Sequence, residues 1–282
     1  MRAEDMDASW AAVGPPLVAI ASAAQLAAAT AATAYVPAVL AQTAQTAVGS
    51  PVAIVVPTAF AGVAADGRSL PGLLTSAVVQ AKLATRPQSV VDGGGKSVTV
   101  PGRAPADALA LGGRALDGLL QTVAADAARG ATQAEIAVRE NVGYVRMVNP
   151  PCCGRCAILA GKWFPWNAGF PRHPRCDCLG IPATENVAGS LLTDPRALLE
   201  SGLVRVSRRE RERLDRGDDI YKVINESRDM WRARIAEQKA GATAEERAAR
   251  DQKARQGLED LFASTRSRVD AVKAMRDQGY AT

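Results

Sequence analysis

The sequence predicts a mainly α-helical protein with a helical N-terminal region, a small cysteine-rich module with short β elements, and long charged C-terminal helices. Three observations support this fold class. Alanine and valine supply much of the 48% apolar content while aromatic residues make up only 4%, which favours closely apposed helices over a bulky core. All five cysteines and the only histidine fall between Cys152 and Cys178. From Arg205 onward, nineteen Lys and Arg residues stand against fifteen Asp and Glu residues.

Changes in composition along the 282 residues predict four regions. The divisions follow the loss of charge near the N-terminus, a Gly- and Pro-rich stretch, the cysteines and the final charged segment. The regions are an alanine-rich helical N-terminal region (1–85), a linker or loop (86–105), a core with the cysteines and histidine (106–185) and a charged helical C-terminal region (186–282).

The N-terminal region is expected to form several alanine-rich helices separated by proline. A first helix is predicted over Leu17–Tyr35, ending before Pro37 because the residue before a proline disfavours helical backbone. Further helices are predicted over Val39–Val48 and Pro71–Ala84. Between them, residues 51–60 hold two prolines and are too interrupted for a long element.

A membrane span is the alternative for this region, since no charged side chain occurs between Ala8 and Ala65. Alanine, threonine, serine and glutamine contribute little transfer free energy, and prolines divide the run. We therefore expect no membrane span. Acidic residues beside Arg2 do not suit a secretory leader, so synthesis in a reducing cytoplasm is expected.

The stretch from Arg86 to Pro105 reads as a linker or exposed loop with one short strand, Ser97–Val100. Its three consecutive glycines are not expected to be a phosphate-binding loop, because no strand-to-helix context surrounds them, although Lys96-Ser97 follows. After it, Asp107–Met147 has helical spacing of apolar residues. A second helix is predicted to start at Thr132, where Glu135 completes a capping-box pattern, and to carry Tyr144.

The cysteines and histidine are arranged as metal ligands. Cys153 and Cys156 form a C-x-x-C pair, and Gly154 between them is expected to allow a tight turn. His173, Cys176 and Cys178 follow at a distance typical of zinc-binding modules. We predict a structural Zn²⁺ held first by Cys153, Cys156, His173 and Cys176.

Cys178 is the strongest substitute in this set, for His173 or for Cys176, and Cys152 is expected to be a spare buried thiol. Two alternatives stay open. In the first alternative the cysteines pair as disulfides, although an odd number cannot pair completely. In the second they serve as small buried apolar residues.

Basic and aromatic residues accompany the predicted metal site and make nucleic-acid contact an alternative. The mildly basic balance, with a net charge of +5 and a pI of about 9.1, permits such contact without proving it. Aromatic residues between the two halves of the site are expected to form a small core rather than to stack on bases. The candidates for phosphate contact are Arg155, Lys162, Arg172 and Arg175.

No catalytic site is expected. The only histidine is a predicted ligand, so neither a Ser-His-Asp nor a Cys-His arrangement is available. The H-E-x-x-H motif of zinc proteases is missing, and no histidine lies upstream of the cysteines as a zinc deaminase would need. A serine–lysine protease is the remaining enzymatic alternative.

Charge dominates the C-terminal region. Asp194-Pro195 and the capping box of Ser207 with Glu210 predict helix starts. Asp218–Ile235 and Thr243–Tyr280 are predicted to be long solvated helices with sparse apolar stripes, divided at Gly241. One reading is a solvated helix face, and the other is a helical arm that docks on a multimeric partner.

Several of these motifs resemble those of MuF-like minor head proteins of tailed bacteriophages, in the branch found in phages of actinobacteria. The resemblance covers roughly Gln133 to Arg228, a third of the chain, and the two ends carry no matching motif. The residues that carry it are Tyr144-Val-Arg-Met, Cys153-x-x-Cys156 with Leu159-Ala-Gly161, His173-Pro-x-Cys176-x-Cys178 with Ile181-Pro182, and Arg216 to Asn225.

The resemblance implies a minor capsid protein of the virion, located in the capsid interior or near the portal and assembled in the host cytoplasm. It implies a role in head morphogenesis and possible involvement in DNA packaging or ejection. The expected partners are the portal or the major capsid protein, with several copies around a ring, and packaged DNA. Some relatives are labelled capsid maturation protease, a label that these residues do not support.

Overall fold

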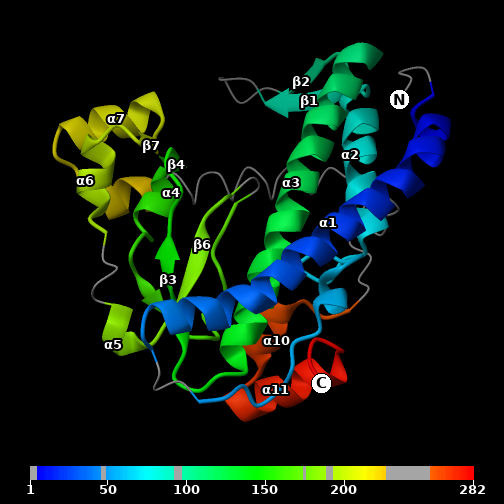
Figure 1. Ribbon diagram of the computed structural model, residues 1–282. Coiled ribbons are helices and arrows are strands. Elements are labelled where there is room, and N and C mark those ends of the chain that lie inside the picture. The colour runs from blue at the N-terminus through cyan, green and yellow to red at the C-terminus, as the bar shows by residue number, and fades with distance from the viewer. Residues whose placement is uncertain (1–4, 46–48, 92–96, 174–175, 189–192, 227–254) are drawn as a thin grey trace.

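The computed structural model describes residues 5–45, 49–91, 97–173, 176–188, 193–226 and 255–282. Within them the fold is mostly helical with short strands, in agreement with the predicted class (Figure 1). The N-terminal helices are α1 (Met6–Gln42), the 3₁₀ turn η1 (Pro57–Phe60), α2 (Leu70–Ala84) and α3 (Pro105–Ala137). The strands are β1 (Gln88–Val91), β2 (Ser97–Val100), β3 (Gly143–Met147), β4 (Cys152–Cys153), β5 (Trp163–Phe164), β6 (Leu179–Ala183) and β7 (Val204–Arg205). The remaining helices are α4 (Gly154–Ala157), α5 (Glu185–Ala188), α6 (Pro195–Glu200), α7 (Arg208–Asp215), α10 (Leu258–Ser264) and α11 (Arg268–Asp277).

Helix α3 is the central helix of the N-terminal half and packs against both α1 and α2. Small residues make this packing close. A Cβ atom added to Gly112 of α3 would lie 2.8 Å from Cβ of Ala81 and 3.0 Å from the carbonyl oxygen of Ala77, both in α2. The alanine-rich composition therefore serves helix–helix packing, as expected from the sequence.

The predicted division of the first 48 residues into two helices is wrong. A single helix, α1, runs through Pro15, Pro16 and Pro37. Each interior proline costs roughly 3 kcal/mol, but all three lie on the exposed side, so burial on the opposite side is kept. That buried side contributes Ala21, Ala29, Ala32, Val36 and Leu40 to the core.

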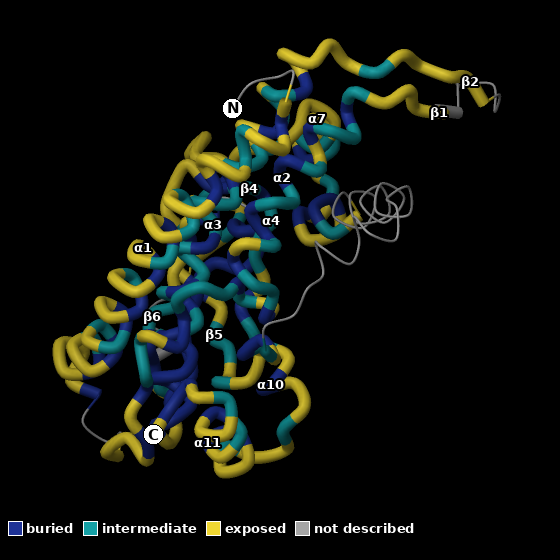
Figure 2. The backbone as a smooth tube through the Cα atoms, turned by 90° about the vertical axis from the view of Figure 1, so that its right-hand side faces the viewer, coloured by how far each residue is buried: buried dark blue, intermediate teal, exposed yellow. Residues whose placement is uncertain are grey.

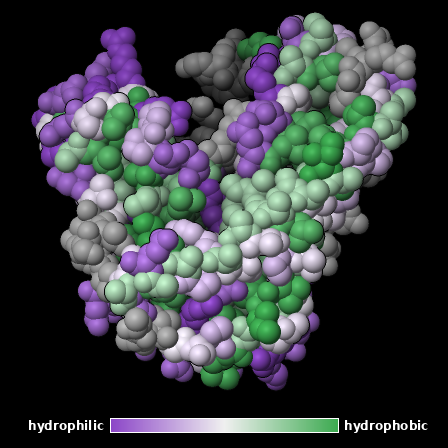
Figure 3. Space-filling model, viewed as in Figure 1, coloured by the Kyte–Doolittle hydropathy of each residue, from purple (hydrophilic) through white to green (hydrophobic). Residues whose placement is uncertain are grey.

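The outward side of α1 is exposed along its whole length (Figure 2). In the space-filling view it crosses the molecule as a mostly pale band of intermediate hydropathy (Figure 3). By length and composition α1 is able to cross a membrane, and 22% of its most apolar window is buried within the protein. The expectation that the chain does not span a membrane stays a prediction.

The predicted second helix from Thr132 is also wrong, because α3 continues through that residue to Ala137. Gly130 does not interrupt the helix. The ring of Phe60 packs onto it, and an added Cβ would lie 3.1 Å from that ring. The chain then leaves the helix, so Tyr144 lies in strand β3 and not on a helical turn.

Strand β3 is the centre of a three-stranded antiparallel sheet with the order β5-β3-β6. A separate parallel pair joins β4 to β7. The predicted strand Ser97–Val100 is confirmed as β2, and it pairs with β1 in an antiparallel hairpin between α2 and α3. Nothing in these pairings tests the division into four regions, which stays a prediction.

Two predicted helix starts in the C-terminal region are confirmed. The carboxylate of Asp194 accepts a hydrogen bond from the amide of Arg196 at the start of α6. In α7, Ser207 and Glu210 form both hydrogen bonds of the capping box. Residues 220–226 are helical, and the rest of the predicted helix to Ile235 lies outside the described residues.

The prediction of one long helix over Thr243–Tyr280 is wrong in residues 255–282, the part that the structure describes. Two shorter helices, α10 and α11, are separated at Thr265, whose backbone is extended. Their large apolar residues are buried except Val269, which is 79% exposed. Leu258, Leu261, Phe262, Val272 and Met275 join a core cluster with alanines of α1 and α3.

The end of the chain is tied to this core by backbone hydrogen bonds. The amide of Val56 donates to the carbonyl oxygen of Tyr280, and Ile54 exchanges hydrogen bonds with Thr282. The rings of Phe60 and Tyr280 lie 5.2 Å apart. The last 25 residues are therefore part of the folded body and not a solvated arm.

Candidate metal site

The sheet and the β4–β7 pair place the predicted ligands at one end of β3. Cys153 closes β4 and Cys156 lies in the single turn of α4. His173 and Cys176 belong to the segment between β5 and β6, and Cys178 directly precedes β6. Because β5 and β6 both pair with β3, this segment returns to the side of α4.

Gly154 has a different role from the one expected. Gly154 is not one of the described glycines with a positive φ angle. A glycine is therefore not needed here for a left-handed turn. A Cβ atom at this position would lie 2.4 Å from Cδ1 of Ile224. The glycine lets the helical turn over residues 220–226 approach the cysteine pair.

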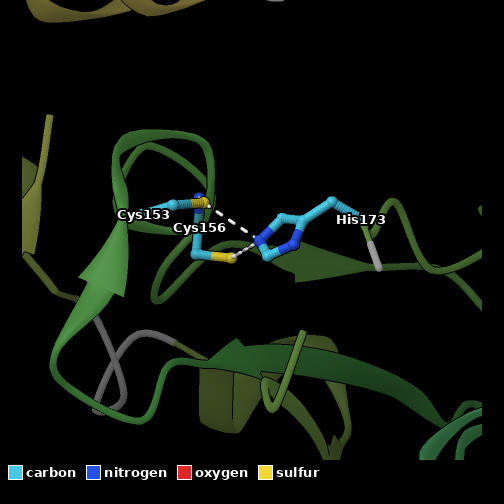
Figure 4. A group of neighbouring side chains, drawn as sticks. All are labelled: Cys153, Cys156 and His173. Atoms are coloured by element: carbon cyan, nitrogen blue, oxygen red, sulfur yellow. Dashed lines mark hydrogen bonds between the residues drawn. The ribbon is translucent and has the colours of Figure 1, made fainter. Parts of the chain in front are cut away.

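Three side chains converge in Figure 4. The Sγ atom of Cys153 lies 3.1 Å from Nε2 of His173, and Sγ of Cys156 lies 3.6 Å from the same nitrogen. On its other side, Sγ of Cys156 lies 3.8 Å from Sγ of Cys176. The ligand atoms form two groups of three, Cys153–Cys156–His173 and Cys156–Cys176–Cys178, each within 4.8 Å. The structure therefore brings together all five predicted metal ligands, and Cys156 is common to both groups.

The separations at Cys156 fit a tetrahedral zinc site, while the 3.1 Å between Cys153 and His173 is shorter than a tetrahedral edge. With Zn–S bonds of about 2.3 Å and Zn–N bonds of about 2.0 Å, two sulfurs lie about 3.8 Å apart and a sulfur and a nitrogen about 3.5 Å apart. The contacts of Cys156 with Cys176 and His173 match both values. The described cysteines are free thiols, so the disulfide alternative is not what this structure shows.

The sulfurs differ in their affinity for protons. Hydrogen bonding from the Cys156 thiol lowers the pKa of Cys153 to about 4, and His173 adds to this effect. Hydrogen bonds from Cys156 and Cys178 lower the pKa of Cys176. The pKa of Cys156 is raised, since its proton is shared with Cys153 and Cys176. For Cys178, sharing with Cys176 and burial outweigh the lowering effect of Cys156 and raise the pKa to about 11.

Arg146 is a site residue that was not among the predicted ones. Its side chain is 1% exposed, and Nη2 lies 3.7 Å from Sγ of both Cys156 and Cys176. Nη1 donates to the carbonyl oxygen of Pro171, and the guanidinium lies 4.4 Å from the ring centre of Phe170. A lone cation in the apolar strand Gly143–Met147 was the signal in the sequence that pointed to it.

A second buried arginine holds the backbone of the ligand segment. Arg129 of α3 donates from Nε to the carbonyl oxygen of Cys178 at 3.0 Å and from Nη2 to that of Cys176. Its Nη1 lies 2.9 Å from Asp126, which also pairs with Arg172 at 2.6 Å. These contacts hold the segment that carries the ligands against helix α3.

The C-terminal helix α10 contacts the same segment through Glu259. Its Oε1 accepts a hydrogen bond from the amide of Phe170 at 3.1 Å and pairs with Nη1 of Arg172 at 2.5 Å. Arg172, a nucleic-acid candidate, is thus bound by two carboxylates inside the chain. No sequence motif signals this contact, because 87 residues separate the partners.

Two other nucleic-acid candidates, Arg155 and Lys162, lie near α4 and the turn at 220–226. Arg155 donates to Oδ1 of Asn225 at 2.9 Å, and Nζ of Lys162 lies 4.5 Å from the ring centre of Tyr221. Both cations therefore have partners within the chain, and a role in phosphate contact stays a prediction.

Cys152 lies beside the cluster but is not part of it. Cys152 is buried, its amide donates to the carbonyl oxygen of Leu203 at 2.9 Å, and it belongs to neither ligand group. This agrees with its expected role as a spare thiol. Arg175, the fourth nucleic-acid candidate, lies outside the described residues.

The predicted aromatic core is observed in part. Phe164 and Phe170 lie 5.1 and 5.5 Å from Tyr144 between ring centres, next to the ligand segment. Trp166 instead packs edge-on against Phe262 of α10, and Trp163 donates from Nε1 to Ala183 at 3.0 Å.

Comparison with known proteins gives no relative: no protein-family model, curated protein or solved structure matches this chain. The chemistry of the site is therefore argued from its own geometry.

Proposed function

We propose that the cluster binds one structural Zn²⁺, held by Cys156 and three of Cys153, His173, Cys176 and Cys178. The observation that carries this proposal is the position of Cys156. Its sulfur lies from His173 and from Cys176 at the distances expected between two ligands of a tetrahedral zinc ion. Thiolate and imidazole are the donors that zinc prefers. The ligand set first expected, with Cys153, Cys156, His173 and Cys176, is kept.

A structural role follows from the number of donors. Five candidate ligands lie in two groups that share Cys156, and a tetrahedral site needs four, so protein atoms are sufficient to fill the coordination shell. The ion would add charge stabilisation and fix the α4 turn to the segment before β6. Arg146 and Arg129 supply positive charge beside a thiolate-rich shell, which offsets its excess negative charge.

We further propose that the chain is a minor head protein of a tailed phage, located near the portal and acting in capsid assembly. Its support is the resemblance of residues 133–228 to MuF-like proteins, together with the convergence of the cysteines and histidine of that motif on one site. In this proposal the metal ion makes the cysteine-containing module rigid. The partners of the protein are the portal or the major capsid protein.

The metal proposal is tested by elemental mass spectrometry of the purified protein, before and after dialysis against a chelator. One zinc per chain supports it, and zinc below a tenth of that value in protein refolded with added zinc contradicts it. The head-protein proposal is tested separately, by co-expression with a portal protein and a major capsid protein encoded in the same genome. Co-purification with the portal ring supports it. Assembly of normal heads when this gene is deleted contradicts it.

A further inference from the structure

A second candidate site lies outside the metal ligands, in a cleft of about 570 Å³ between α1, α3 and β6. Figure 1 shows α1 crossing α3 close to β6, where these three elements meet. Clefts of about 300–1,000 Å³ with mainly apolar walls are the usual sites for small molecules. Its apolar walls are Ala28, Ala31 and Ala32 of α1, Ala125, Ala128 and Ile136 of α3, and Leu179 of β6.

The cleft is elongated. The residues that α3 contributes run from Ala125 to Ile136, which corresponds to about 16 Å at 1.5 Å per residue. The alanines of α1 and α3 have side chains too short to fill the space between the two helices. An extended, unbranched apolar molecule fits such a shape better than a compact one.

One residue of the wall, Gln133, carries an unsatisfied polar atom that is enclosed by the protein. Gln133 is 4% exposed, and among the described residues its Nε2 has no hydrogen-bond partner. A buried amide nitrogen without a partner destabilises the protein, and a ligand with an acceptor would remove this cost. Two neighbouring charged residues of the wall already have partners. Arg129 is bound to Asp126 and two carbonyl oxygens, and Asp177 accepts a hydrogen bond from Asn149 at 3.3 Å.

We propose that this cleft binds an acyl chain whose carbonyl-type oxygen accepts a hydrogen bond from the Gln133 amide. The inference is independent of the metal, since none of the five metal ligands lines the cleft. A free fatty acid and the acyl group of a lipid share this chemistry, and the experiment separates them.

The experiment measures binding to the full-length, zinc-loaded protein by isothermal titration calorimetry below the micelle concentration. The probes are dodecanoate and methyl dodecanoate, which carry acceptors, and dodecyltrimethylammonium, which does not. We expect the acceptor probes to bind more tightly. Ala31→Leu, at an exposed position of α1, and Ala128→Leu, on α3, should weaken binding of all probes by more than about tenfold, because each fills the cleft. Ala23→Leu, exposed on α1 but outside the cleft, is the matched control and should not change binding.

Gln133→Leu separates the hydrogen bond from the apolar contact. It should weaken binding of the acceptor probes by about 3- to 10-fold and leave dodecyltrimethylammonium unchanged. It should also raise the melting temperature of the ligand-free protein, because a buried amide without a partner is removed. A small cavity of about 30 Å³ also borders Gln133, and a water bound there would satisfy the amide. In that case the melting temperature falls and the probes do not discriminate, and the proposal is overturned.

Phosphatidylcholine vesicles identify whether the bound acyl chain comes from a lipid or from a free fatty acid. Vesicle binding that Ala31→Leu abolishes assigns a lipid acyl group, and binding of free dodecanoate without vesicle binding assigns a fatty acid. Vesicle binding that Ala31→Leu leaves unchanged would mean that α1 adheres by its outer face, which contradicts the proposal. Zinc content is measured for every variant, so a loss of the metal site is distinguished from a loss of the cleft. Absence of binding by all three probes also overturns the proposal.

Discussion

The guanidinium of Arg146 lies against the sulfur of Cys156, with Nη2 and Sγ 3.7 Å apart in a fully buried environment. A buried cation is costly unless negative charge or acceptors surround it. Two cysteine sulfurs, the carbonyl oxygen of Pro171 and the face of Phe170 serve that purpose here. Arg146 and the thiolates therefore stabilise each other, with direct consequences for metal binding.

Arg146→Met should lower zinc affinity by about 10- to 100-fold, the usual effect of losing a partner of the ligating atoms. The side chain keeps comparable length and apolar contact with Phe170 but brings no charge to the sulfurs. Affinity is measured by competition with a chromophoric chelator. Arg209→Met, at an exposed position of α7, is the control. Equal affinities for the two variants would show that Arg146 does not act on the metal site.

Cys156→Ser should abolish stoichiometric zinc binding and lower the melting temperature sharply, because this sulfur belongs to both ligand groups and metal-binding free energy is also folding free energy. Cys152→Ser is the matched control, since Cys152 is buried nearby but outside both groups. Zinc per chain and the melting curve are measured for both variants. Retention of one zinc by Cys156→Ser would refute the proposed ligand set.

Single substitutions also decide the fourth ligand. Under the set first expected, Cys178→Ser keeps one zinc per chain and His173→Ala loses affinity, while the reverse pattern assigns the fourth position to Cys178. Replacement of zinc by Co²⁺ provides an independent reading, because the visible spectrum distinguishes three sulfur ligands with one nitrogen from four sulfurs. A spectrum of six-coordinate Co²⁺ would contradict a tetrahedral site.

Glu259→Ala should lower the free energy of unfolding by about 1–3 kcal/mol, since it removes the acceptor for the Phe170 amide and leaves Arg172 with one carboxylate. Glu212→Ala is the control, because its ion pair with Arg208 is exposed to solvent and should contribute less than about 1 kcal/mol. Urea denaturation at constant zinc measures both. Equal losses would mean that α10 does not support the ligand segment.

Tyr280 gives the stability of the protein a defined dependence on alkaline pH. Burial raises its pKa above the ordinary value of 10.0, and its hydroxyl donates to the carbonyl oxygen of Gln256 at 3.0 Å. The folded state thus favours the neutral phenol, so this contribution is complete below about pH 10 and is lost as pH rises through the folded pKa. The difference in unfolding free energy between wild type and Tyr280→Phe should shrink above pH 10, with the exposed Tyr221→Phe as control. A constant difference would contradict this assignment.

Local signals in the sequence predicted several elements correctly. Helix α2, strand β2 and the caps at Asp194 and Ser207 were predicted because each depends on residues within one or two turns. Helix α1 was predicted wrongly, since packing of its buried side outweighs the local cost of Pro15, Pro16 and Pro37. The helix predicted for Thr243–Tyr280 failed for the same reason in the described part, where core burial and not solvation places α10 and α11.

By itself, the sequence determined that sulfur and imidazole donors concentrate in one window, because ligand type and close spacing are local properties. It also determined that small apolar residues build the helices. Only the tertiary structure decided that Cys156 belongs to both groups of candidate ligands, that Arg146 and Arg129 lie beside the cluster, and that Glu259 holds the segment from 87 residues away. Those contacts join residues far apart in the chain, and their geometry is fixed by strand pairing and helix packing rather than by any local preference.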